Sequence, residues 1–246
     1  MNDAALISRL LALADDELIL GQRNSEWTGH APILEEDIAF SNIAQDEIGH
    51  ALVWYTILYE QLGQPHPDRQ VFWRRAHEFR NSTLVELPKG DWAVTIIRQY
   101  LFDEFEKARN AVLAQDVYQP IVDAVGKIAR EEVYHLMHSR GWVQRLGDAT
   151  DESHRRMQDA LDDLWPHALG LFEPIEHDVE FSAQLDRIQL AWLEAVTPTL
   201  THATLIIPPD AAPTFGGRRG QHSAHLTLLL DEMQKVARSE APDAVW

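Results

Sequence analysis

The helical spacing of its apolar residues constrains this chain more than any other feature. Apolar residues recur at i, i+3, i+4 and i+7 through most of the first 165 positions, and strand-like alternation is scarce. Several of the expected helices are 20 to 29 residues long, which corresponds to about 30 to 43 Å at about 1.5 Å per residue. We therefore expect an all-α protein: a four-helix bundle with additional helices and an irregular C-terminal extension.

Turn-forming residues indicate where the helices end. Gly63–Pro67 ends the second long helix, and Pro120 suits the first turn of a later one. The helical pattern weakens toward the C-terminus, and no boundary separates two cores. We expect a single domain over 1–246, with a bundle core over about 1–147 and accessory helices and a tail over about 148–246. The expected helices cover about 3–24, 34–62, 69–81, 92–115, 120–146, 151–164, 182–195 and 223–239.

Composition argues against several kinds of site and partner. The chain has 39 Asp and Glu against 21 Lys and Arg, a net charge of −18, which disfavours binding to nucleic acid or to anionic membranes. It has no cysteine, so disulfides, zinc–thiolate sites and iron–sulfur clusters are excluded. We find no export signal and no apolar stretch near the roughly 18 to 20 residues of a membrane span. These features predict a cytoplasmic protein with no membrane or nucleic-acid partner.

Two of the long helices each carry a Glu-x-x-His sequence. The first pair is Glu47 with His50, and the second is Glu132 with His135. Residues three apart on a helix share a face, so both side chains of a pair can reach one ion. A single pair of this kind arises often by chance. Two pairs on the second and fourth long helices are typical of metal-binding bundles, which also need one carboxylate from each of the other two helices.

The first and third long helices can each supply that carboxylate. Glu17 lies 30 positions before the first pair, and Glu104 lies 28 positions before the second. Apolar neighbours one turn away favour Glu104 over its neighbour Asp103. The same criterion does not separate Asp15, Asp16 and Glu17, so Glu17 is chosen for its spacing and its longer side chain. The pattern of Glu followed by Glu-x-x-His therefore occurs twice, as in a duplicated helix pair.

Four carboxylates and two imidazoles predict a di-iron or di-manganese centre, because these ligands suit iron and manganese better than softer metals. Acidic residues next to the ligands are expected to hydrogen-bond them: Asp46, Asp103 and Glu131. The alternative is a proton-sharing network of carboxylates and histidines in a metal-free bundle. We expect no flavin, NAD or haem in this chain, so electrons for O₂ chemistry would come from another protein.

Five segments are long enough to suggest a family: Gly21–Pro32, Ala39–Ala44, Arg98–Tyr100, Tyr134–Trp142 and Gly216–His222. In these segments the chain resembles the C subunits of bacterial multicomponent phenylacetyl-CoA epoxidases, which are ferritin-like proteins. The resemblance covers essentially the whole chain. It implies a role in the O₂-dependent epoxidation of the phenylacetyl-CoA ring during aerobic phenylacetate degradation. It also implies three partners: a separate flavin/iron–sulfur reductase that donates electrons, a catalytic A subunit, and a small B subunit.

The resemblance further implies that the di-iron centre belongs to the A subunit, and that the C subunit is its structural partner. In C subunits most ligand positions are often replaced, whereas all six are present here. We therefore expect this chain to bind metal as well as to scaffold the A subunit. Two alternatives stay open: a metal-free structural subunit, and a ferritin-like protein that stores or detoxifies iron. Arg218 and Arg219, at one of the densest basic spots, are candidate contacts for a partner or for the phosphates of CoA.

Overall fold

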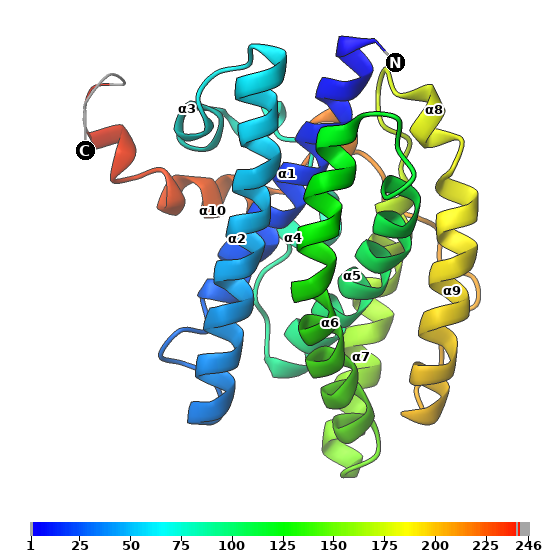
Figure 1. Cartoon of the computed structure of the whole chain (residues 1–246). Coiled ribbons are helices and arrows are strands. Elements are labelled where there is room, and N and C mark those ends of the chain that lie inside the picture. The colour runs from blue at the N-terminus through cyan, green and yellow to red at the C-terminus, as the bar shows by residue number, and fades with distance from the viewer. Residues whose placement is uncertain (1, 240, 242–246) are drawn as a thin grey trace.

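The computed structural model in Figure 1 describes residues 2–239 and 241. These residues form helices and loops without any strand, so the all-α prediction is confirmed. None of the described helices is long and apolar enough to cross a membrane. The α-helices are α1 (Asp3–Ser25), α2 (Leu34–Leu62), α3 (Pro67–Phe72), α4 (Thr83–Glu86), α5 (Trp92–Leu113), α6 (Gln119–Gly147), α7 (Asp151–Leu169), α8 (Val179–Ser182), α9 (Leu185–His202) and α10 (Ala224–Met233). The 3₁₀ turns are η1 (Ala76–Glu78), η2 (Gly170–Phe172), η3 (Gly217–Arg219) and η4 (Ala237–Ser239).

Four long helices, α1, α2, α5 and α6, form the bundle that the periodicity predicts. α1 packs along α2 and α5 packs along α6, while α7 and α9 pack against α5 (Figure 1). α1 and α2 approach closely at Gly21, where a Cβ atom would lie 2.8 Å from Ile48 Cγ1 and 3.0 Å from the carbonyl oxygen of Ala44. Glycine is therefore required at this position if the two helices are to stay at their present separation.

The predicted helix over 69–81 is wrong in its second half. α3 ends early, and only the single turn η1 follows it. The backbone N–H groups beyond this turn find acceptors on α1 instead of on a preceding helical turn. Arg80 N donates to Asp15 Oδ2 and Ser82 N donates to Asp16 Oδ1, each at 2.7 Å. Local periodicity cannot indicate this ending, because the acceptors belong to a helix 65 residues earlier in the chain.

One cluster of buried apolar side chains extends from Leu6 in α1 to Leu230 in α10. The largest fully buried side chains include Trp54 of α2 and Trp192 of α9. Trp192 stacks on Trp165 with 5.0 Å between the ring centroids, which joins α9 to α7. The helices that follow the bundle therefore pack into the same apolar cluster as the bundle itself.

Buried ion pairs hold the C-terminal extension against the bundle. Arg218 Nη2 donates to Asp16 Oδ2 at 2.6 Å, with both side chains under 5% exposed. Glu173 Oε2 accepts hydrogen bonds from two backbone N–H groups of the tail. His222 Nδ1 lies 2.6 Å from Glu86 Oε2. The tail is thus fixed at three points by carboxylates that are buried from solvent.

The two arginines expected to contact a partner or CoA have different surroundings. Arg218 lies in the interior, and its guanidinium is used by Asp16 and by two backbone carbonyl oxygens. Arg219 is half exposed, and its Nε donates to Glu173 Oε1 at 2.9 Å. Arg219 is therefore the one of these two residues whose side chain is exposed for contact with a second molecule, whereas Arg218 binds within the chain. The two residues are adjacent in an irregular segment, where the sequence carries no periodicity that would separate an inward from an outward side chain.

Replacing Arg218 by Met should lower the free energy of unfolding by about 3 to 5 kcal/mol, because Asp16 would remain as an uncompensated buried charge. Replacing its neighbour Arg219 by Ala should change it by about 0 to 1 kcal/mol, because that ion pair is solvated. Urea unfolding followed by circular dichroism measures both values. Equal effects of the two substitutions would contradict the role given to Arg218.

The contact between Glu86 and His222 should make the stability of the packed C-terminal extension depend on pH. Burial would raise the pKa of Glu86, but hydrogen bonds from His222 and Ser223 outweigh it and hold that pKa below the ordinary value of 4.5. The stabilisation is therefore present above pH 4.5 and is lost as the pH falls through the lowered pKa. The difference in melting temperature between wild type and Glu86→Gln should shrink over that pH range. A difference that is constant with pH would contradict this assignment.

Candidate metal centre

Acidic and imidazole side chains from α1, α2, α5 and α6 meet in the interior of the bundle. Each of them is at most 5% exposed. Their ligand atoms form three groups in which all atoms lie within 4.8 Å of one another. The groups share members, so they make one continuous centre. The groups are Glu17 with Glu47 and His50, Glu47 with Glu132 and His135, and His50 with Glu106 and Glu132.

Both histidines direct Nδ1 toward Glu132, and each also faces one further carboxylate. His50 Nδ1 lies 3.5 Å from Glu132 Oε1 and 4.0 Å from Glu17 Oε2. His135 Nδ1 lies 3.0 Å from Glu132 Oε1 and 3.5 Å from Glu47 Oε1. Each Glu-x-x-His pair thus presents both of its side chains to the centre, as the helical spacing predicts.

The other nitrogen of each histidine contacts a carboxylate on the opposite helix. His50 Nε2 of α2 lies 2.7 Å from Glu131 Oε2 of α6, and His135 Nε2 of α6 lies 3.2 Å from Asp46 Oδ2 of α2. A carboxylate on Nε2 holds the proton at that nitrogen and leaves the lone pair of Nδ1 to bind a cation. Two of the three expected supporting carboxylates, Asp46 and Glu131, therefore lie where they can orient the histidines.

α5 contributes different carboxylates from the one expected. Glu104 is absent from all three ligand groups; its Oε1 accepts a hydrogen bond from Arg140, and its Oε2 lies 3.8 Å from Lys107 Nζ. Glu106 joins the centre in its place. Apolar neighbours one turn away do not identify the inward-facing carboxylate of α5. This helix packs against α6, α7 and α9, so almost its whole surface is buried. On such a helix the informative feature is the polar side: Gln99, Asp103, Glu106 and Asn110 lie at i, i+4, i+7 and i+11 and share one face.

Asp103 lies on this polar face beside the centre. It accepts hydrogen bonds from Ser139 Oγ and from Gln99 Nε2, and the same amide donates to Glu47 Oε1 at 3.0 Å. Burial, together with the negative charge of Glu132, raises the pKa of Asp103 well above its usual range. Asp103 is therefore a carboxylate of the inner bundle, held in position by neighbours on α5 and α6.

Arg109 is a component of the centre that the sequence reasoning missed. Its side chain is 1% exposed, and Nη2 donates to Glu17 Oε1 at 2.8 Å and to Glu106 Oε1 at 2.6 Å. Glu106 and Arg109 are three residues apart on α5, a spacing that favours an ion pair. That spacing is visible in the sequence, but it is common on solvated helix faces and does not by itself indicate a buried pair.

The donor atoms of the centre fit a metal ion. Glu132 has two buried oxygens without a hydrogen-bond partner, and the other members each leave one ligand atom without a partner: Oε2 of Glu17, Glu47 and Glu106, and Nδ1 of His50 and His135. Each unsatisfied buried polar group costs about 1 to 3 kcal/mol, and more when it is charged. A divalent cation would satisfy these atoms together. Oxygen and imidazole donors without thiolate suit iron or manganese.

The pKa values of the carboxylates also indicate that the centre suits a metal ion. Burial raises the pKa values of Glu17, Glu106 and Glu132 well above the ordinary value, and neighbouring carboxylates raise them further. For Glu47 the effect of burial is outweighed by His135 and its other neighbours, which lower its pKa to about 2. Without a metal ion, the centre must take up protons to offset its negative charge. A cation that displaces those protons would occupy the same space.

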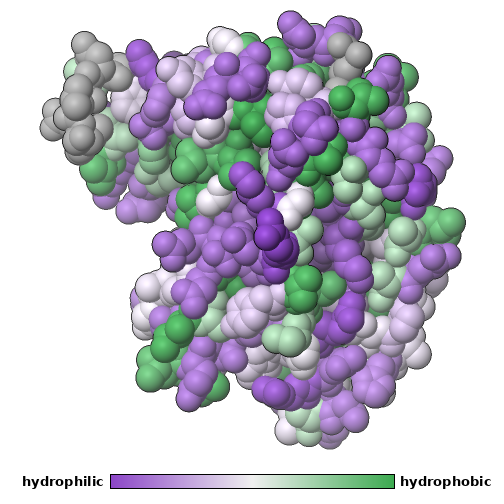
Figure 2. Space-filling model, viewed as in Figure 1, coloured by the Kyte–Doolittle hydropathy of each residue, from purple (hydrophilic) through white to green (hydrophobic). Residues whose placement is uncertain are grey.

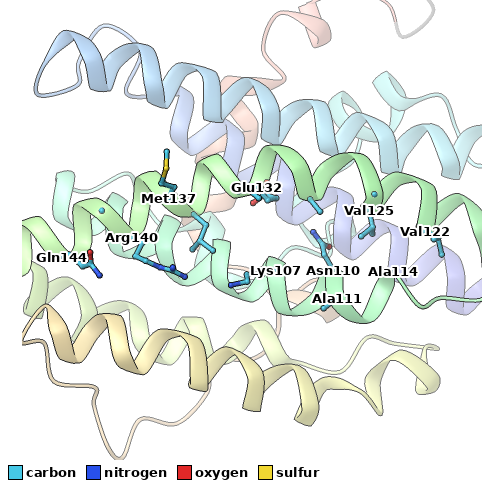
Figure 3. Close-up of a pocket in the computed structure, with 15 residues that line it drawn as sticks. Lys107, Asn110, Ala111, Ala114, Val122, Val125, Glu132, Met137, Arg140 and Gln144 are labelled. Carbon is cyan, nitrogen blue, oxygen red and sulfur yellow. The ribbon is translucent and has the colours of Figure 1, made fainter.

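A cavity of about 930 Å³ lies against α5 and α6 (Figure 3). Its wall is largely apolar, with Val122, Val125 and Met137 among the lining residues. Glu132 also lines it and lies near the middle of the labelled residues in Figure 3. The cavity therefore extends to one of the candidate ligands, and a small apolar molecule inside it could approach the centre.

A helical bundle with a Glu-x-x-His pair from each of two helix pairs belongs to the ferritin-like class. Within that class the chain belongs to the phenylacetic acid catabolic protein family, whose model matches residues 1–246. The chain is 37% identical over 238 residues to the C subunit of 1,2-phenylacetyl-CoA epoxidase from Escherichia coli (strain K12), an alignment that covers 95% of this chain and 96% of that relative. It is 25% identical over 180 residues to the A subunit of the same epoxidase, covering 73% of this chain and 57% of that relative. The resemblance found in the sequence motifs is thereby confirmed.

Replacing Asp46 by Asn should weaken metal binding about 10- to 100-fold, because His135 would lose the carboxylate that orients its ring. Competition with a fluorescent chelator for Fe²⁺ or Mn²⁺ measures this change. Glu60→Gln is the matched control, since Glu60 is an exposed carboxylate of the same helix. An affinity unchanged by Asp46→Asn, or reduced equally by the control, would contradict the role of Asp46.

Proposed function

We propose that the chain is the C-type subunit of a multicomponent oxygenase that epoxidises the ring of phenylacetyl-CoA in aerobic phenylacetate catabolism. The nearly full-length similarity to a C subunit supports this assignment. In the complex the chain scaffolds a catalytic A-type subunit. The assembly is completed by an electron-donating reductase and a B-type subunit, and the CoA thioester is the substrate of the complex as a whole.

An exposed apolar face supports docking of the A-type subunit. α2 exposes Leu52 and Tyr59, and α6 exposes Val133, Tyr134 and Met137. Figure 2 shows further apolar residues at the end of α2 that lies at the lower left of the view. Large exposed apolar patches on soluble proteins mark interaction sites. Because the A-type relative is similar in sequence to this chain, two bundles of related fold can pair through this face in a nearly symmetric arrangement.

In this proposal the chain also holds its own metal centre. The convergence of buried ligand atoms that have no hydrogen-bond partner carries this part of the proposal. Bound iron supplies redox chemistry toward O₂ when a reductase provides electrons. The chain's own residues orient the ligands, because Asp46 and Glu131 hold the protons on the two histidines, and apolar side chains of the core pack around the site.

Two other functions compete with this one. A metal-free structural subunit is favoured by one observation, the buried positive charge of Arg109 beside two of the carboxylates. An iron-storing ferritin-like protein would assemble into a shell and load mineral without CoA. The nearly full-length similarity to one component of an epoxidase argues against storage.

Co-expression with an A-type subunit tests the assignment and the metal centre together. Wild-type chain should contain iron or manganese and should co-purify with the A-type subunit. The double variant Glu47→Ala/Glu132→Ala should lose the metal but still co-purify, because its docking face is unchanged. Glu104→Gln is the matched control and should retain the metal, since Glu104 lies outside the ligand groups.

Each part of the proposal can fail separately. Failure to co-purify with the A-type subunit would contradict the assignment as a C-type subunit. A negligible amount of metal in the wild-type chain would contradict the metal centre and favour the purely structural role. Ring epoxidation by the reconstituted complex then reports whether the centre takes part in turnover: it should fall with the double variant only if the metal of this chain is used.

A further inference from the structure

The two halves of the centre are not equivalent, although the sequence pattern that builds them is repeated. The half around His50 contains Glu17 and Glu106, and both of these bind the guanidinium of Arg109. In the half around His135, the described ion pairs of Glu47 and Glu132 involve histidines alone. A guanidinium is therefore present in one half, whereas no arginine or lysine of the described residues pairs with Glu47 or Glu132 in the other.

We propose that Arg109 takes the place of one of the two expected metal ions, so that the chain binds a single ion between Glu47, Glu132 and His135. A guanidinium stays charged at all accessible pH values. In the interior of the bundle, it repels a second divalent ion that would share the oxygens of Glu17. This inference rests on the metal centre of the proposed function and changes its stoichiometry from two ions to one.

The ion pair of Glu106 with Arg109 supports this inference. Glu106 is the carboxylate that α5 contributes to the centre. It lies one turn before Arg109 and binds it through Oε1. The carboxylate of Glu106 therefore partly neutralises the buried charge of Arg109 without a metal ion. Arg109 still has Nη1 without a partner and reaches Glu17 as well.

The carboxylates of the two halves also differ in whether an arginine already binds their oxygens. Glu132 has two oxygens without hydrogen-bond partners, and His135 Nδ1 lies 3.0 Å from one of them. Glu17, by contrast, already has one oxygen occupied by Arg109 at 2.8 Å. An ion beside His135 therefore meets carboxylates that no arginine binds, whereas an ion beside His50 meets two carboxylates that Arg109 already binds.

Metal stoichiometry of the full chain tests this proposal. Metal-free protein is loaded with Mn²⁺ without oxygen, separated from free ion by gel filtration, and analysed by mass spectrometry for metal and by electron paramagnetic resonance. Wild type should bind one ion per chain and give the spectrum of an isolated Mn²⁺. His135→Ala should lose this ion, whereas the matched variant His50→Ala should retain it.

Removal of the Arg109 guanidinium should allow a second metal ion to bind in the half around His50. Arg109→Met removes the guanidinium, keeps Glu106 as a ligand, and should bind two ions, with the spectrum of a coupled Mn²⁺ pair. The variant Arg109→Lys keeps the positive charge and should still bind a single Mn²⁺ ion.

Two ions per wild-type chain, or equal loss in His50→Ala and His135→Ala, would overturn the inference and leave the proposed metal centre standing. No ion in wild type would overturn both. The two histidine variants leave Arg109 in place, so they decide the question even when the Arg109 variants fail to fold.

Discussion

Compensation of buried negative charge is the constraint on which the rest of this structure depends. Carboxylates from four helices meet in the middle of the bundle, where each must be neutralised by a proton, a protein cation or a metal ion. The chain supplies two imidazoles and one guanidinium, that of Arg109, and several ligand atoms remain without a partner. The arrangement of α1, α2, α5 and α6 around a cation site follows from this requirement as much as from apolar packing.

The same principle explains how one turn of α1 organises distant parts of the chain. Asp15 binds Arg74 in the segment after α3, Asp16 binds Arg218 in the C-terminal extension, and Glu17 joins the buried carboxylate and histidine cluster. Consecutive residues on a helix point in directions about 100° apart, so three adjacent carboxylates reach three different neighbours. Packing of the loop and of the tail is therefore coupled to the helix that carries one candidate ligand.

The surroundings of the centre indicate where other molecules can contact it. On the α2–α6 side, the carboxylates that bind the histidines are partly exposed among the apolar residues assigned to docking. On the α5–α6 side, the cavity extends to Glu132. Val133 and Met137 belong to the docking face and also line this cavity. An A-type subunit on that face would therefore contact the wall of the cavity as well as Asp46 and Glu131, so association of the subunits would also limit the access of a small molecule to the centre.

The amino-acid sequence is sufficient to predict the helical class, the four long helices and both Glu-x-x-His pairs, because the periods of apolar residues and of ligands are local properties of a helix. Its contiguous motifs also indicate the family. Tertiary packing, in contrast, determines which carboxylates of α5 face inward, where the helix after Pro67 ends, and that Arg218 is buried. It also places Arg109 inside the centre. Each of these depends on side chains that arrive from distant helices, and a pattern read along one helix carries no information about charges supplied by another.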